Sequence, residues 1–144
     1  MEPPERHSVG RFDADAKSVF TAAQRDAEER GGTVLVSGLL LRAAASAEGT
    51  LSARLLEALS TDIETLNAAV DAEWNSRSRW MQDQPFTIVK EAFEAVDRDS
   101  PTNSELHLDA LLANMLRFPD SMASRVVRRL GCEPSAVAEH LTAN

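Results

Sequence analysis

With 144 residues, 43% of them hydrophobic, the chain can fold around one core without help from disulfides or metal ions. Its 15 basic and 23 acidic residues give a net charge of −8, which argues against nucleic-acid binding and against an anionic membrane surface as partner. A single cysteine excludes an internal disulfide, and no apolar run approaches the ~18 residues of a membrane span. We therefore expect one cytoplasmic domain with no nucleic-acid and no membrane partner.

The first half of the chain has the apolar spacing of helices. Four apolar stripes follow one another, over residues 12–27, 39–44, 51–59 and 63–74. The expected helix starts are Asp13, Ser37, Thr50 and a capping box, Thr61-x-x-Glu64. Because strand signals are scarce, these stripes favour an all-α fold. Trp74 continues the fourth stripe and is expected in the core.

The same order returns after a polar stretch. Four further stripes run over residues 89–96, 108–116, 122–130 and 137–141. The expected starts are Thr87, Pro119-Asp120 and Pro134, the last at the first helical position, and Gly131 is expected to end the seventh helix. The segment 53–59 also corresponds to 124–130, with an arginine at the second position and leucine or valine at the third, fourth and seventh positions of both.

This repetition predicts how the chain is organised. We expect an all-α fold in which eight helices form two pseudo-twofold four-helix repeats in one compact domain. The predicted boundaries are a flexible tail (1–8), one domain (9–144), repeat one (9–73), a linker (74–84) and repeat two (85–142).

Three segments connect these repeats with a known family. The first repeat opens with Arg11-Phe12-Asp13-x-x-Ala16, and the second with Phe86-Thr87. The stretch 116–131 supplies a third-helix segment. Over residues 9–142 the chain resembles the N-terminal double Clp repeat domain of the Clp-family AAA+ unfoldases. The resemblance implies a domain that binds adaptors, tagged or damaged substrates, or cyclic-peptide antibiotics.

The chain departs from that family at the second helix of each repeat. Where family members have Gly-Thr-Glu-His, the first repeat has Val36-Ser37-Gly38-Leu39 and the second has His107-Leu108-Asp109-Ala110, which retains one acid. No Gly-x-x-x-x-Gly-Lys-Ser/Thr loop for nucleotide phosphates is present, and the sequence stops at Asn144. We therefore expect a binding module without a motor.

The resemblance also implies a ligand site in each repeat. In the family, a threonine and a glutamate are candidates for binding phosphorylated arginine, the carboxylate facing the guanidinium. In the first repeat Asp13 and Gly38 cannot reproduce this contact, whereas Thr87 and Asp109 of the second can. The alternative for Asp109 is an ordinary acid at a helix start, favoured there by the helix dipole.

A groove between the repeats is where partners dock in the family. Phe12 and Phe86 hold matching positions in the two repeats. Each of them either packs under the start of its own helix or borders that groove. The predicted groove residues are Val9, Phe12, Trp80, Met81, Phe86, Thr87 and Asp109.

Catalytic, metal and cofactor chemistry are not indicated. The residues His7, His107, Cys132 and His140 lack metal-ligand spacing, and no nucleophile motif occurs. We expect a non-enzymatic protein without cofactors, acting as an adaptor or as a decoy that sequesters such antibiotics. Its partners would be Clp protease components, their adaptors or substrates, or cyclic peptides. The alternative is a structural or regulatory interaction protein that kept the fold and lost the ligand site.

Overall fold

The computed structural model describes residues 12, 14–31, 36–47, 49–76, 91, 92, 94–98, 107–119 and 121–142. The expected tail over residues 1–8, most of the expected linker and the starts proposed at Asp13 and Thr87 lie outside these residues.

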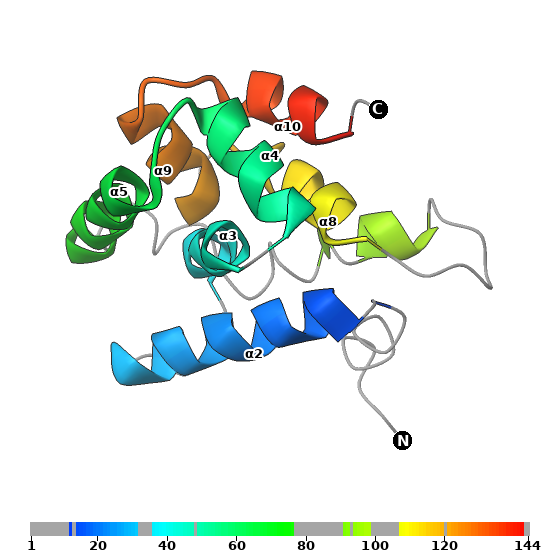
Figure 1. The fold of residues 1–144 in the computed structure, drawn as a ribbon, viewed down its shortest axis with the longest axis horizontal. Coiled ribbons are helices and arrows are strands. Elements are labelled where there is room, and N and C mark those ends of the chain that lie inside the picture. Colours follow the sequence, from blue (N-terminus) through cyan, green and yellow to red (C-terminus); the bar gives the residue numbers. More distant parts are fainter. Residues whose placement is uncertain are drawn as a thin grey trace.

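Helices account for every regular element that these residues form, which confirms the all-α prediction (Figure 1). The first half contains α2 (Ala14–Glu29), α3 (Ser37–Ser46), α4 (Thr50–Leu59) and α5 (Ile63–Asn75). The second half contains α8 (Leu108–Met115), α9 (Met122–Arg129) and α10 (Pro134–Thr142), and residues 91, 92 and 94–98 are also helical. Helix α5 extends two residues into the expected linker.

The two halves repeat their helices in the same order. Helix α8 begins 71 residues after α3, α9 begins 72 residues after α4, and α10 begins 71 residues after α5. The residues before α3 and α8, Val36 and His107, have the same extended backbone angles, φ −112° and ψ 141°. The repetition seen in the sequence is therefore present in the backbone.

Several helix ends agree with the sequence and three starts do not. Gly131 ends α9 with φ +82°, a left-handed conformation that suits glycine, and Pro134 begins α10. The expected capping box at Thr61 is wrong by one residue, because Asp62 is the N-cap and accepts the Thr65 N–H at 2.8 Å. Two adjacent residues could both cap this turn, and the sequence pattern alone did not separate them.

The other two corrections concern serines. Helix α9 does not start at Pro119-Asp120, because Ser121 is its N-cap and accepts the Ser124 N–H. Ser37 is not a cap of its own helix; it is the first helical residue of α3, and Val36 precedes it as N-cap. The Ser37 hydroxyl instead serves another helix, as described below.

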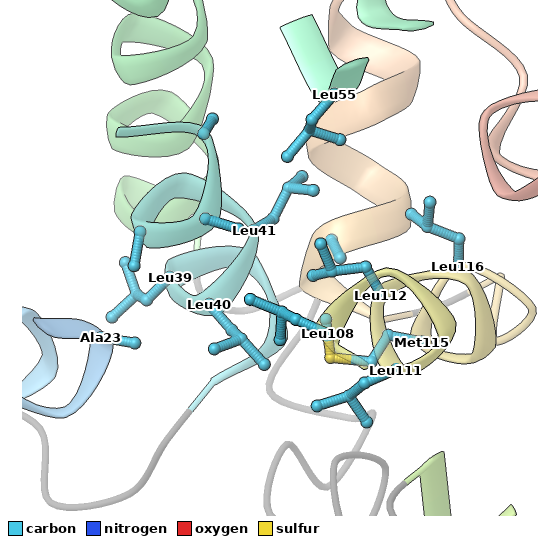
Figure 2. Packing of buried hydrophobic residues seen from close by; sticks show 14 of the residues in the cluster. Ala23, Leu39, Leu40, Leu41, Leu55, Leu108, Leu111, Leu112, Met115 and Leu116 are labelled. Atoms are coloured by element: carbon cyan, nitrogen blue, oxygen red, sulfur yellow. The ribbon is translucent and has the colours of Figure 1, made fainter. Parts of the chain in front are cut away.

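The core is continuous between the halves. Helix α3 is buried along almost its whole length, and it contacts α2, α4, α5 and α9. Its leucines belong to the same buried cluster as those of α8 (Figure 2). Helix α4 also packs on α10, and α5 packs on α9, so each half covers helices of the other (Figure 1).

Polar contacts join helices at two places, one between the halves and one within the first half. Arg129 of α9 donates from Nε to the buried Glu73 of α5 at 2.8 Å. At the end of α2, Arg30 pairs with Asp26 and with Asp71 of α5, both at 2.8 Å, and lies over the ring of Trp74 at 5.5 Å. Burial opposes the charge of Arg30, but its bonds to the two aspartates outweigh burial and raise its pKa. Trp74 is 8% exposed, which confirms its expected place in the core.

Among the described helices, none combines the length and the apolar character needed to cross a membrane.

Candidate functional site

The predicted groove falls largely outside the described residues. Of its seven residues, the structure describes Phe12 and Asp109. The remaining five, Val9, Trp80, Met81, Phe86 and Thr87, lie outside the described part, so the groove as a whole stays a prediction.

Phe12 lies inside the core. Its side chain is 2% exposed and meets Phe20 of α2 edge to face, with ring centroids 5.2 Å apart. This burial agrees with the first of the two interpretations, in which Phe12 tucks under its own helix start. It leaves almost no Phe12 surface for a partner.

Asp109 lies in the first turn of α8 and is only partly buried. Its Oδ1 accepts the backbone N–H of Ala110 at 2.8 Å, as expected for an acid that stabilises a helix start. Its Oδ2 lies 3.5 Å from Nη1 of Arg54, which comes from α4 in the other half of the chain. Asp109 therefore does face a guanidinium, and this guanidinium belongs to the same chain.

Arg54 connects three helices. Besides its contact with Asp109, its Nη2 donates to the main-chain oxygen of Leu141 in the last turn of α10. Carbonyl groups at a helix C-terminus lack intrahelical partners and carry partial negative charge, so a guanidinium is a suitable group to satisfy them. No local sequence pattern indicates this contact, because Arg54 and Asp109 are 55 positions apart.

The equivalent position in the first half is closed. Gly38 stands where the second half has Asp109, and a Cβ added to it would lie 2.5 Å from Cγ and 2.6 Å from Sδ of Met122. Met122 begins α9 and is fully buried. The absence of a side chain at Gly38 lets the start of α9 lie directly on the start of α3.

Ser37 holds the same junction by a hydrogen bond. Its Oγ accepts the backbone N–H of Ala123 at 3.0 Å, one of the N–H groups that a helix start leaves without an intrahelical partner. Ser121 and Ser124, both buried, complete the polar contacts of this turn, since Ser124 Oγ donates to the carbonyl of Phe118 at 2.8 Å. The prediction that Ser37 is a capping residue named the wrong helix, because Ser37 caps α9 and not its own helix, α3.

Other candidate chemistry is weak in the described part. It contains no group of three or more histidine, cysteine and acidic side chains that could hold a metal ion. Cys132 is half-buried, with Sγ 3.3 Å from the carbonyl of Leu59. A shallow, open hollow occurs where α4 meets α5, lined by Leu56, Glu57, Ser60, Thr61, Asp62 and Thr65. Nothing in this hollow has the arrangement of a catalytic or metal site.

No protein-family model matches the chain, and no curated protein sequence matches it. The resemblance to the Clp N-terminal domain stays a prediction that rests on the sequence motifs described above.

Proposed function

We propose that the chain is a non-enzymatic binding module of the Clp N-domain type. It recognises ligands of the Clp unfoldase N-domain, namely adaptors, tagged or damaged substrates, or cyclic-peptide antibiotics. The observation that supports this proposal most is the all-helical body in which α3, α4 and α5 recur as α8, α9 and α10 at offsets of 71 or 72 residues. A repeated helical unit at this spacing is the architecture that the sequence motifs imply.

A module of this kind works as an adaptor or as a decoy. The 144 residues carry no phosphate-binding loop, so the module itself does not use nucleotide energy. As a decoy it lowers the concentration of free ligand by mass action, and the ligand stabilises the folded module in return. Its net charge of −8 favours cationic ligands or basic surfaces on protein partners.

Calorimetric titration with a panel of Clp-directed cyclic peptides tests the antibiotic-binding version. We expect saturable binding of at least one peptide and a higher unfolding temperature in its presence. A flat titration with every peptide contradicts this version. Capture of Clp subunits or their substrates from the native host by the immobilised protein tests the adaptor version, which fails if none is recovered.

The two tryptophans allow a sharper test of the groove. Trp74 is buried beside Arg30, whereas Trp80 is one of the predicted groove residues. In a Trp74→Phe variant, Trp80 is the single tryptophan, and its emission should shift when a peptide found by calorimetry is added. The matched Trp80→Phe variant reports on Trp74 and should show no shift. An unchanged emission from Trp80 at saturation would place the ligand elsewhere.

One observation favours the second candidate, an interaction protein that kept the fold and lost the ligand site. In the first half, the position of the family's acid is Gly38, and Met122 covers it. This half therefore has no carboxylate at that position and no space for one unless the Met122 side chain is displaced. The two candidates differ in the second half, where Asp109 remains partly exposed.

A further inference from the structure

We propose that Arg54 is an intramolecular occupant of the Asp109 carboxylate, which an incoming guanidinium ligand has to displace. This inference rests on the proposed function, since it takes Asp109 as a group that meets a ligand. The class of ligand is an arginine side chain presented on a peptide. The phosphorylated and plain forms of that side chain share the guanidinium chemistry.

The geometry around Asp109 is that of an occupied site for a guanidinium. The Oδ1 atom is committed to the Ala110 N–H of its own helix, which fixes the carboxylate. The Oδ2 atom faces the guanidinium of Arg54, which comes from α4. The half-buried environment of Asp109 thus accepts this planar cation in the folded protein.

The contact is one that a ligand can replace. Nη1 of Arg54 and Oδ2 of Asp109 are 3.5 Å apart, longer than the ~2.7–2.9 Å of a well-formed charged hydrogen bond. Their side chains are 34% and 28% exposed, so solvent and solutes reach both. Ion pairs of this exposure contribute little to stability, and breaking one costs little.

Arg54 also keeps a partner when it leaves Asp109. Its Nη2 bonds the Leu141 carbonyl at the end of α10, where a cation is favoured by the helix dipole. The displaced guanidinium therefore is not left without a hydrogen-bond acceptor. A ligand therefore has to compete with Arg54 for the Asp109 carboxylate.

The expected size of the effect follows from competition. An internal competitor reduces the apparent affinity by the fraction of molecules in which the site is free. For a partly exposed pair, its removal should strengthen binding by about two- to fivefold.

The test is an NMR titration of the full chain with a short arginyl peptide and, separately, with the same peptide carrying phosphoarginine. Arg54→Gln should bind two to five times more tightly than the wild type, and Asp109→Asn should lose most of the binding. The double variant should match Asp109→Asn, because the competitor has no effect without its carboxylate. Arg54→Lys keeps the charge without the guanidinium geometry and should lie between wild type and Arg54→Gln.

Arg125→Gln is the matched control, since Arg125 stands at the equivalent place in the repeated segment 124–130. It removes the same charge and should leave the affinity unchanged. Thermal unfolding of each variant confirms that it is folded under the titration conditions. Only a tighter complex for Arg54→Gln than for Arg125→Gln supports the proposal.

Three outcomes would overturn it. Equal or weaker binding by Arg54→Gln would mean that Arg54 is a spectator or contacts the ligand. Binding that survives Asp109→Asn would place the guanidinium elsewhere. Absence of binding of either peptide to every variant would remove the guanidinium site, while the proposed function would stand if a cyclic peptide or a Clp subunit still bound.

Discussion

The starts of α3 and α8 show how one backbone geometry serves two purposes. Val36 and His107 precede these helices with identical φ and ψ angles, and the helices begin 71 residues apart. At α3 the second residue is Gly38, covered by Met122 of α9. At α8 it is Asp109, partly exposed and paired with Arg54 of α4.

The two helix starts have the same backbone geometry, yet they do not offer the same side chains to a ligand. The start of α3 is a packing junction between the halves, and the absence of a side chain at Gly38 leaves room for the start of α9. The start of α8 keeps an acid within reach of solvent. If the module binds a guanidinium, it does so in its second half alone, and the first half contributes structure.

The largest effect is expected when a carboxylate is introduced at the start of α3. Gly38→Glu places a carboxylate under the buried Met122, and the overlap and the desolvated charge should cost about 3 kcal/mol or more. Urea unfolding measures this change. Asp109→Glu is the matched control in α8, where the side chain is partly exposed, and it should stay within about 0.5 kcal/mol.

The Gly38→Ala variant tests a smaller overlap at the same position. It requires only that the Met122 side chain move away from the new Cβ, so its loss of stability should be smaller than that of Gly38→Glu. Equal stability of Gly38→Glu and wild type would mean that α9 does not lie on the start of α3, and the contrast between the two starts would disappear.

A smaller loss is expected when the hydroxyl that joins α3 to α9 is removed. Ser37→Ala leaves the buried N–H of Ala123 without this acceptor, which should cost about 1–3 kcal/mol. The same unfolding experiment measures it. Ser18→Ala, on the exposed face of α2, should be nearly neutral. A neutral Ser37→Ala would show that the bond to Ala123 does not hold the junction.

The smallest effect concerns a cap that titrates. The pKa of Asp62 is lowered from its ordinary 3.8, chiefly by the Thr65 N–H bond. Because folding lowers the pKa of Asp62, the charged cap stabilises the protein when the pH is above the pKa of the unfolded chain. This contribution disappears as the pH falls through the pKa of the folded protein. Asp62→Asn keeps an acceptor without the charge, so its stability should approach that of the wild type in acid.

Ser121, the cap of α9, gives the matched comparison because its hydroxyl does not titrate. The cost of Ser121→Ala should be the same across the acidic range, measured by urea unfolding at each pH. A pH-independent gap between Asp62→Asn and wild type would argue against the charge of Asp62 as the stabilising feature.

The helices could be predicted from local pattern, whereas the junctions could not. Within the described residues, apolar spacing identified the buried helix faces, because residues three and four apart lie on the same face of a helix. Two of the three apolar residues of the expected stripe 89–96, Val89 and Phe93, lie outside the described residues. Ser37 was predicted to be a capping residue, but its hydroxyl accepts the N–H of Ala123, which lies 86 positions away. Local sequence contains no information on that partner.

The candidate site divides in the same way. Asp109 was singled out through the resemblance, with an ordinary acid at a helix start as the alternative, and the structure places it in the first turn of α8. Its pairing with Arg54 depends on how α4 approaches α8, a matter of tertiary packing. The lack of space for a side chain at Gly38 likewise depends on how α9 packs on α3, because Met122 covers this position.

The reciprocal packing of α4 on α10 and α5 on α9 has a consequence for biosynthesis. When the ribosome has released only the first 76 residues, the faces of α3, α4 and α5 that will meet α9 and α10 have nothing to cover them. Such long-range pairing delays the gain in free energy until the last helices emerge. We therefore expect the first repeat to be less stable on its own than in the full chain, because these faces are covered only when α9 and α10 are present.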